Sequence, residues 1–408
     1  MIVGVPTETA AEETRVALIP PVAEELVDEG HEVYIAAGAG EGAFWSDEAY
    51  EAVGCEVLES REAVFERADV VLQVRALGAT DADTDPYREG QLVVALLGPY
   101  DIADATLEGV ADRRVSAFAL ELMPRISRAQ SMDALSSMAS LVGYEACLLA
   151  ATEAPKMFPM EMTAAATIRP AEVFVIGAGV AGLKAIATAE RMGASVRGYD
   201  IRLEVKEEVE SLGADFVELD LETEGSGDEE GYAREMDEEF YAEQRRQLTR
   251  VVGESDVVIT SAAIPGAPAP ELVTTEMIEE MDPGSVVVDL SAETGGNCEP
   301  TEADERVVHE GVTILGPTDL PSRISKTASQ QFANNLANFL DELVVEGEPV
   351  VDLDNEIHES TLLTHEGEVR NPHRDETGAE SDGDETGAES DGDDPDEHAG
   401  DQEAEDSQ

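Results

Sequence analysis

The stretch VFVIGAGVAGLKAIATAERMGASVRGYD, residues 173–200, decides the fold of the second half of the chain. An apolar run of strand type leads into Gly177, Gly179 and Gly182, and a helical pattern begins directly behind them. In this G-x-G-x-x-G arrangement the first glycine permits a tight turn, the second lets the backbone approach a pyrophosphate, and the third allows close helix packing. The free N–H groups of the helix then face the phosphate charge. The stretch predicts a Rossmann-type unit that binds a dinucleotide, although glycines can also make a purely structural turn.

An acidic residue follows at the spacing that such a unit needs. Asp200 stands 23 residues after Gly177, at the end of the next predicted strand. A carboxylate there accepts from a ribose 2′-OH and repels a 2′-phosphate, so it predicts NAD(H) rather than NADP(H). A cation two residues on, Arg202, would favour the opposite choice if it stood alone. The predicted cofactor-binding set also includes Val180, Ile201, Ala262 and Ala263.

Strand-like and helix-like segments alternate along the rest of the chain, as in IVGVP, PPVAEELVDEG and HEVYIAAG near the start. This alternation predicts two Rossmann-like, doubly wound parallel-sheet domains. Apolar residues at helical spacing predict one long helix over 131–153, leading into the second domain, and another over 322–344, leading back. The expected domains are 1–140 together with 318–372, then 141–317, then a tail over 373–408. Two crossings leave a cleft between the domains, which is where ligands usually bind.

The tail and the overall charge are both strongly acidic. Residues 375–383 read DETGAESDG and 384–392 repeat it, so the tail is expected to be disordered, as solubilising filler or as an acidic interaction arm. The chain has 91 acidic and 25 basic residues, a net charge of −66. Concentrated salt would screen the self-repulsion, which predicts a halophilic, high-salt cell interior. The absence of a basic stripe argues against nucleic acid as a partner.

The sequence predicts no direct membrane insertion and no metal site. Its longest apolar runs fall far short of the roughly 20 residues that cross a bilayer, and its start lacks a secretory pattern, so a cytoplasmic chain is expected. Cys55, Cys147 and Cys298 match no metal or disulfide spacing and are expected to be buried thiols. Neither H-E-x-x-H nor G-x-S-x-G occurs, which leaves hydride chemistry on the bound cofactor.

The loop PRISRAQSMDALSSMA, residues 124–139, gathers two guanidiniums, a carboxamide and a carboxylate in front of an apolar helix. Capping that helix needs one side-chain oxygen, from Ser131 or Asp133. The other polar groups, Arg125, Arg128 and Gln130, are surplus to capping. They indicate a ligand or partner, or else solvated loop charge.

Six stretches, in this order, resemble the alpha subunits of proton-translocating NAD(P) transhydrogenases, and more narrowly their extramembrane NAD(H)-binding domain. The resemblance covers about residues 1–372 and implies that a hydride passes directly between NAD(H) here and NADP(H) on a partner subunit. It also implies separate membrane subunits that translocate protons, a homodimer, and a place beside the membrane through those partners. The stretches are GVPTETAAEETRVALIPPVAEEL, PRISRAQSMDALSS, the glycine fingerprint, EGYAREMDEEF, TSAAIPGAPAPELVTTEMI and GPTDLPSRISKTASQQFANNL.

The same resemblance implies roles for the loop over the nicotinamide. Arg125 and Asp133 would hold the ring end of the cofactor, Gln130 would bridge toward the incoming nucleotide, and Ser136 would bond the carboxamide. Holding two rings face to face is the main catalytic task in a direct hydride transfer.

Two further positions follow from the resemblance. The segment 222–244 resembles the family's mobile loop, whose tyrosine, Tyr232 here, closes over the bound cofactor. Ala267 stands where the family usually carries a basic residue, so a cationic contact is not expected there.

Two alternatives remain open. Alanine dehydrogenases share the N-terminal pattern, including Arg15, but they depend on a lysine and a histidine where this chain has Arg75 and then Leu96 and Leu97. Without a general acid–base, such an activity would be crippled. The other alternative is a non-catalytic NAD-sensing protein.

Overall fold

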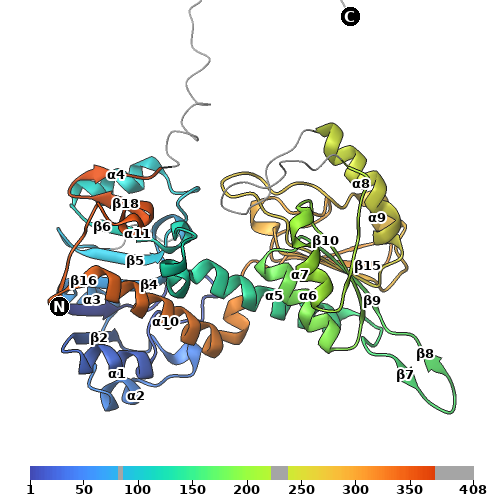
Figure 1. Ribbon diagram of the computed structural model, residues 1–408. Coiled ribbons are helices and arrows are strands. Elements are labelled where there is room, and N and C mark those ends of the chain that lie inside the picture. Colours follow the sequence, from blue (N-terminus) through green and yellow to red (C-terminus); the bar gives the residue numbers. More distant parts are fainter. Residues whose placement is uncertain (81–85, 222–237, 373–408) are drawn as a thin grey trace, which may run out of the picture.

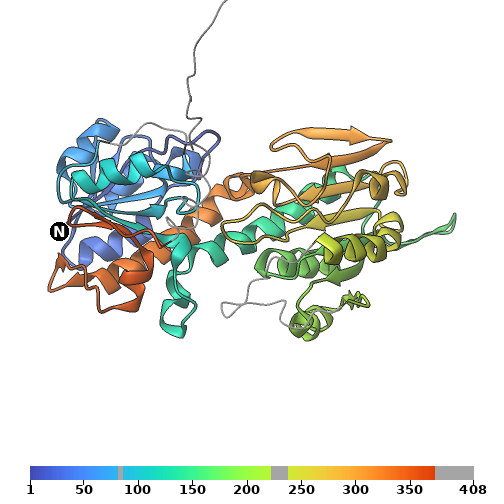
Figure 2. The ribbon, with the colours of Figure 1, turned by 90° about the horizontal axis from the view of Figure 1, so that it is seen from above.

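Two open, mostly parallel sheets dominate the computed structural model, which describes residues 1–80, 86–221 and 238–372 (Figures 1 and 2). We call the eight-stranded sheet with its helices the first lobe, and the seven-stranded sheet with its helices the second lobe. The predicted fold class, two Rossmann-like α/β units, is confirmed. Within the described ranges, each sheet carries antiparallel strands only at an edge.

The first lobe has the strand order β19-β18-β6-β5-β4-β1-β2-β3. Its central strand β4 (Val70–Arg75) is apolar along most of its length because helices cover both faces of the sheet. Leu72 and Val74 point to the face under α1, and Val71 points to the opposite face under α3. The other elements are β1 (Ile2–Val5), α1 (Pro20–Asp28), β2 (Glu32–Ala36), α2 (Asp47–Ala52), β3 (Glu56–Leu58), α3 (Arg61–Arg67), β5 (Leu92–Leu96), α4 (Asp104–Asp112), β6 (Ser116–Ala119), the pair β16 (Val344–Val345) and β17 (Glu348–Pro349), α11 (Glu356–Thr361), β18 (Leu362–His365) and β19 (Glu368–Val369).

The second lobe has the strand order β11-β10-β9-β12-β13-β15-β14. Helices α6 and α7 cover one face of this sheet, and α8 and α9 cover the other. A hairpin of β7 (Glu161–Met162) and β8 (Thr167–Ile168) projects from this lobe (Figure 1). The other elements are β9 (Glu172–Ile176), α6 (Val180–Arg191), β10 (Ser195–Tyr199), α7 (Lys206–Ser211), β11 (Asp215–Phe216), α8 (Glu238–Gly253), β12 (Val257–Thr260), α9 (Thr275–Glu279), β13 (Val286–Asp289), β14 (Arg306–His309) and β15 (Val312–Leu315).

Two long helices connect the lobes, α5 (Ala134–Glu153) and α10 (Ser325–Leu343) (Figure 2). They lie close to the predicted helices over 131–153 and 322–344, and a 3₁₀ turn, η4 (Ser127–Met132), precedes α5. Gly143 lets α5 approach α6 closely, because a Cβ there would lie 2.0 Å from the carbonyl oxygen of Ala181. Among the described helices, α5 alone has the length and apolar composition of a membrane span, but here it packs against α6 and α10.

The strands that complete each sheet from a distance were not predicted from the sequence. β18 pairs antiparallel with β6, and β14 pairs antiparallel with β15. The prediction for the three cysteines is confirmed: Cys55, Cys147 and Cys298 are buried and unpaired. Burial raises the pKa of Cys147 and of Cys298 to about 12, so both stay thiols.

Candidate functional site

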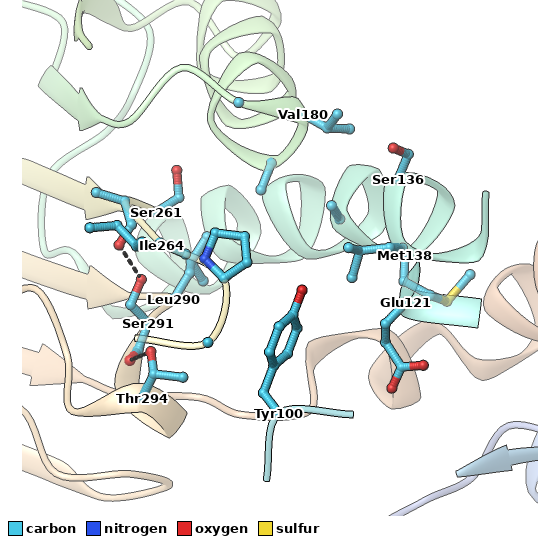
Figure 3. Close-up of a pocket in the computed structure, with 18 of the residues that line it drawn as sticks. Tyr100, Glu121, Ser136, Met138, Val180, Ser261, Ile264, Leu290, Ser291 and Thr294 are labelled. Atoms are coloured by element: carbon cyan, nitrogen blue, oxygen red, sulfur yellow. Dashed lines mark hydrogen bonds between the residues drawn. The ribbon is translucent and has the colours of Figure 1, made fainter. Parts of the chain in front are cut away.

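A cleft of about 1740 Å³ lies between the lobes, with α5 along its floor (Figure 3). Its walls are the carboxyl ends of the parallel strands of both lobes, the usual place for ligands in open α/β sheets. It is larger than a typical ligand pocket of roughly 300–1,000 Å³. The cleft therefore has room for an extended ligand that reaches from one lobe to the other.

The glycine fingerprint forms the turn from β9 into α6 on one wall of this cleft. Gly177 has a φ of +95°, and a Cβ there would lie 2.9 Å from the hydroxyl of Ser261. A Cβ on Gly182 would lie 1.8 Å from the carbonyl oxygen of Gly177, whereas a Cβ on Gly179 would meet nothing within 4 Å. Val180 begins α6 and lines the cleft. The turn thus leaves open space at Gly179, in front of the N-terminus of α6, where a pyrophosphate would fit.

Asp200 follows β10 and is buried, with 5% of its surface exposed. Its carboxylate accepts from the N–H of Ala178 at 2.7 Å and from the guanidinium of Arg202 through Nε at 2.9 Å and Nη2 at 2.8 Å. The sequence predicted a ribose hydroxyl as the partner of Asp200, whereas in this structure Arg202 occupies both carboxylate oxygens. A bound ribose has to share or displace the guanidinium, and a guanidinium held by Asp200 is neutralised toward a 2′-phosphate.

The loop at the start of α5 divides into capping and anchoring parts. Asp133 is the N-cap of α5: it accepts from the N–H of Ser136 at 2.8 Å and from the hydroxyl of Ser136 at 2.6 Å. Arg128 contacts Glu342, and its Nη2 donates to the amide oxygen of Asn355 at 3.0 Å. Of the two arginines and the acid in the loop, Arg128 and Asp133 therefore hold the loop in shape.

The remaining polar residues of the loop are placed differently. Arg125 is exposed and lines the cleft together with Ser136. Gln130 is exposed on η4, and it lies outside the cleft wall, as does Asp133. The structure thus places Arg125 and Ser136 at the cleft, whereas Gln130 faces the surroundings of the molecule.

A loop of the second lobe, residues 261–270, closes the cleft opposite α5. Asn297 fixes it by accepting from the N–H of Ala262 at 3.0 Å and by donating to the carbonyl oxygens of Ala262 and Pro270. Ala262, Ala263 and Ala267 all line the cleft, as do Ile201 and Arg202. Tyr232 lies outside the described residues.

Tyr100 brings the first lobe to this loop. Figure 3 shows its ring between Glu121 on one side and the segment around Ile264 on the other. A Cβ on Gly266 would lie 2.8 Å from Cδ1 of Tyr100. The lobes therefore meet at this point of the cleft.

A buried carboxyl on the first-lobe wall was not predicted from the sequence. Glu121, just beyond β6, accepts through Oε1 from the N–H of Leu97 at 2.7 Å and of Gly98 at 2.8 Å. Its Oε2 is buried and has no hydrogen-bond partner among the described residues. Burial raises the pKa of Glu121 to about 7, against the weaker effects of these N–H groups and of the Arg75 charge. A lone glutamate after a short strand gives no pattern that sequence reasoning can detect.

An ion cluster lies beside this carboxyl. Buried Arg15 binds Glu13 through Nε at 2.7 Å and lies 3.6 Å from Asp319. Arg75 lies 3.5 Å from Glu13 and 3.9 Å from Asp319. Both guanidiniums are therefore neutralised by acids of the chain itself.

The carboxyl of Glu121 predicts a specific pH dependence of stability. In the folded protein it keeps its proton up to a pH of about 7, whereas in the unfolded chain it ionises near 4.5. The free energy of unfolding should therefore fall as the pH rises through this window, and Glu121 should add no slope below or above it. Glu121→Gln keeps an oxygen for Leu97 and Gly98 but cannot titrate, so the slope should shrink. Urea denaturation at pH 5, 6, 7 and 8 measures this.

Glu8 serves as the reference for that experiment. Burial raises its pKa to about 7 as well, and it accepts from the N–H groups of Val74 and Arg75. The slope that remains in Glu121→Gln should therefore shrink further when Glu8→Gln is added. Equal slopes in the wild type and in both variants would contradict the raised pKa values.

Comparison with known proteins adds the family. Residues 4–142 match the model of the alanine dehydrogenase/PNT N-terminal domain, and residues 146–372 match that of the alanine dehydrogenase/PNT C-terminal domain. The chain is 43% identical over 378 residues to the first of the separate chains that make up the NAD(P) transhydrogenase alpha subunit of Rhodospirillum rubrum, covering 91% of this chain and 98% of that protein. It is 27% identical to an alanine dehydrogenase of Methanococcus maripaludis, over 90% of this chain and 94% of that enzyme.

Solved structures agree with these matches. The crystal structure of transhydrogenase from Sinorhizobium meliloti superposes with a TM-score of 0.78 at 40% identity, covering 91% of this chain and 99% of that one. An L-alanine dehydrogenase structure superposes with a TM-score of 0.76 at 24% identity, over 91% of this chain and 97% of that one, which shows a shared fold.

Proposed function

Because the chain belongs to the alanine dehydrogenase/PNT family and, within it, to the NAD(P) transhydrogenase alpha subunits, we propose that it binds NAD(H) and passes a hydride directly to or from NADP(H) on a partner subunit. Separate membrane subunits would couple this transfer to proton translocation. The observation that carries the proposal is the shared cleft. The glycine turn, Asp200 and the start of α5 all face it.

The cofactor would lie along the carboxyl ends of the second-lobe strands. Its pyrophosphate would sit at Gly179 and the start of α6, and its adenosine ribose near Asp200. Its nicotinamide would lie under the loop before α5, where Arg125 and Ser136 line the cleft. The bound cofactor supplies the hydride chemistry, and these residues orient it.

The exposed loop would serve the meeting of the two cofactors. Asp133 fixes Ser136 through two hydrogen bonds, which holds a hydroxyl ready for the carboxamide. Gln130 lies on the outer face of η4, where a side chain can reach a nucleotide that a partner subunit presents. Keeping both rings at near-attack distance is what accelerates such a transfer.

Selectivity for NAD(H) would come from the pair of Asp200 and Arg202. A carboxylate that is buried next to the ribose site repels a 2′-phosphate, and its ion pair keeps the neighbouring guanidinium from attracting one. Comparing the affinity of NADH with that of NADPH tests this. Equal affinities would contradict it.

The alternative, alanine oxidation, is not favoured by the first-lobe wall. An amino-acid substrate would need guanidiniums free to bind its carboxylate, whereas Arg15 and Arg75 are occupied by Glu13 and Asp319. The stretches around Leu96 and Leu97 also lack a histidine for proton transfer.

The domain limits proposed from the sequence, 1–140 with 318–372 and 141–317, are supported by the sheets. The first-lobe strands lie within residues 2–119 and 362–369, and the second-lobe strands within 172–315. The acidic segment 373–408 lies outside the described residues.

We further propose a homodimer that forms through the projecting hairpin. Met160, Met162 and Ile168 on or beside it are 57%, 73% and 44% exposed, an unusual apolar surface for such an acidic chain. Light scattering should give about twice the mass of 43.5 kDa, and a monomer at micromolar concentration would contradict the dimer.

A cytoplasmic site beside the membrane, and a halophilic source, complete the proposal. The net charge of −66 supports high salt, because ions screen the repulsion between carboxylates. Circular dichroism should show unfolding when KCl is dialysed away. Retention of the full spectrum in dilute buffer would contradict the adaptation.

The decisive test of function is hydride transfer from NADH to an NADP⁺ analogue in molar KCl, with the chain alone and with its NADP(H)-binding partner. Transfer should require both proteins. If the chain binds NADH tightly but no transfer occurs with a folded partner, the proposal is wrong.

A further inference from the structure

One buried amide in the cleft has an acceptor oxygen without a donor. Gln244 on α8 lines the cleft although only 2% of its surface is exposed. Its Nε2 donates to the hydroxyl of Tyr199 at 2.8 Å. Its Oε1 is buried and lacks a hydrogen-bond partner within the described part of the chain. Burying an amide oxygen without a donor is costly, so such an atom in a ligand cleft indicates a donor that arrives with the ligand.

Tyr199 sets which end of the amide is left for the ligand. It is the last residue of β10 and is 4% exposed. Burial raises its pKa to about 12, so its hydroxyl stays neutral. Because the hydroxyl takes the N–H of Gln244, the amide presents an acceptor rather than a donor.

The surroundings of Gln244 are those of an aromatic base. The cleft wall beside it consists of Ile201, Tyr241 and the buried Leu272, with the second-lobe loop at Pro270. Asp200, the proposed ribose partner, directly follows Tyr199 in the chain. A flat apolar slot next to a ribose site, with one unpaired acceptor, suits a base that carries an amino group.

We propose that Gln244 determines base specificity: its Oε1 accepts from the exocyclic 6-amino group of adenine, so that the site takes adenine dinucleotides and disfavours those with a 6-oxo purine. The inference rests on the proposed function, since it assumes NAD(H) in this cleft. With a hypoxanthine or guanine base, two acceptor oxygens would face each other. Tyr199 is then a positioning residue, because it fixes the orientation of the amide.

The test compares binding of NADH with binding of reduced nicotinamide hypoxanthine dinucleotide, which differs at the purine, where a 6-oxo group replaces the amino group. Quenching of protein fluorescence or calorimetry gives both dissociation constants. The wild type should bind NADH about tenfold more tightly, as expected when a buried acceptor loses its donor. Gln244→Leu should weaken NADH binding and abolish the preference.

Two further variants separate recognition from folding. Tyr199→Phe leaves the amide able to turn over, so it should bind both dinucleotides with similar affinity. Gln247→Leu, on the same helix, removes an amide that contacts Asp220 and Glu243 instead of the cleft, and it should retain the tenfold preference.

The outcomes distinguish this inference from the function on which it rests. If NADH fails to bind the wild type, the proposed function is wrong. If NADH binds tightly but the wild type shows no preference, or if Gln244→Leu keeps the preference, Gln244 does not read the base.

Discussion

Gly182→Ala will destabilise the protein by about 3 kcal/mol or more, the upper range for overpacking a rigid site. The added Cβ would lie 1.8 Å from the carbonyl oxygen of Gly177, which is a backbone atom in the turn itself. Neither side can yield without moving α6 away from β9. Urea denaturation of the variant and the wild type, in the same salt, measures the loss.

Gly179→Ala is the matched control for that variant. Here the Cβ would meet nothing within 4 Å, so stability should change by less than about 0.5 kcal/mol. The methyl group would nevertheless stand where the pyrophosphate approaches, and NADH binding should weaken markedly. Equal stability losses for both variants would contradict the packing argument, and unchanged NADH affinity in Gly179→Ala would contradict the placement of the phosphates.

Gln130→Asn will slow hydride transfer to the partner-bound NADP⁺ analogue by about a hundredfold, the cost of displacing an orienting group by about 1 Å. The side chain is exposed on η4 and lies outside the cleft wall. Stability and NADH affinity should therefore stay at wild-type values. Stopped-flow absorbance in molar KCl gives the transfer rate.

Ser127→Ala, on the same 3₁₀ turn, is the control for Gln130→Asn and should leave the rate unchanged. A normal rate in Gln130→Asn would show that the loop does not present its amide to the second cofactor. A slow rate accompanied by weak NADH binding would instead place Gln130 in the cofactor site of this chain.

The parts of the fold that could be predicted from the sequence are those with a local pattern. The strand, glycine turn and helix of residues 173–191 interact within about twenty residues, so the sequence alone specifies their geometry. The long helices α5 and α10 were predicted for the same reason, because helical periodicity is a property of neighbouring turns.

Features that depend on distant partners were not predictable. β18 is a four-residue strand, and only its pairing with β6 gives it a place in the sheet. The ion cluster of Arg15 with Glu13 and Asp319 needs the chain's return through residue 319. Asp200 and Arg202 were both recognised, but their mutual hydrogen bonds depend on side-chain conformations that spacing does not specify.

The pairing of β18 with β6 has a consequence for biosynthesis. Thr364 bonds to the carbonyl oxygen of Val115, a separation of 249 residues. At about 5–20 residues per second, a ribosome needs roughly 10–50 s to supply the second partner. During that time the nascent β6 offers an open edge to other chains, while the second-lobe sheet, whose strands are contiguous in sequence, can already close. The newly made protein is thus most exposed to misassembly in the half that was translated first.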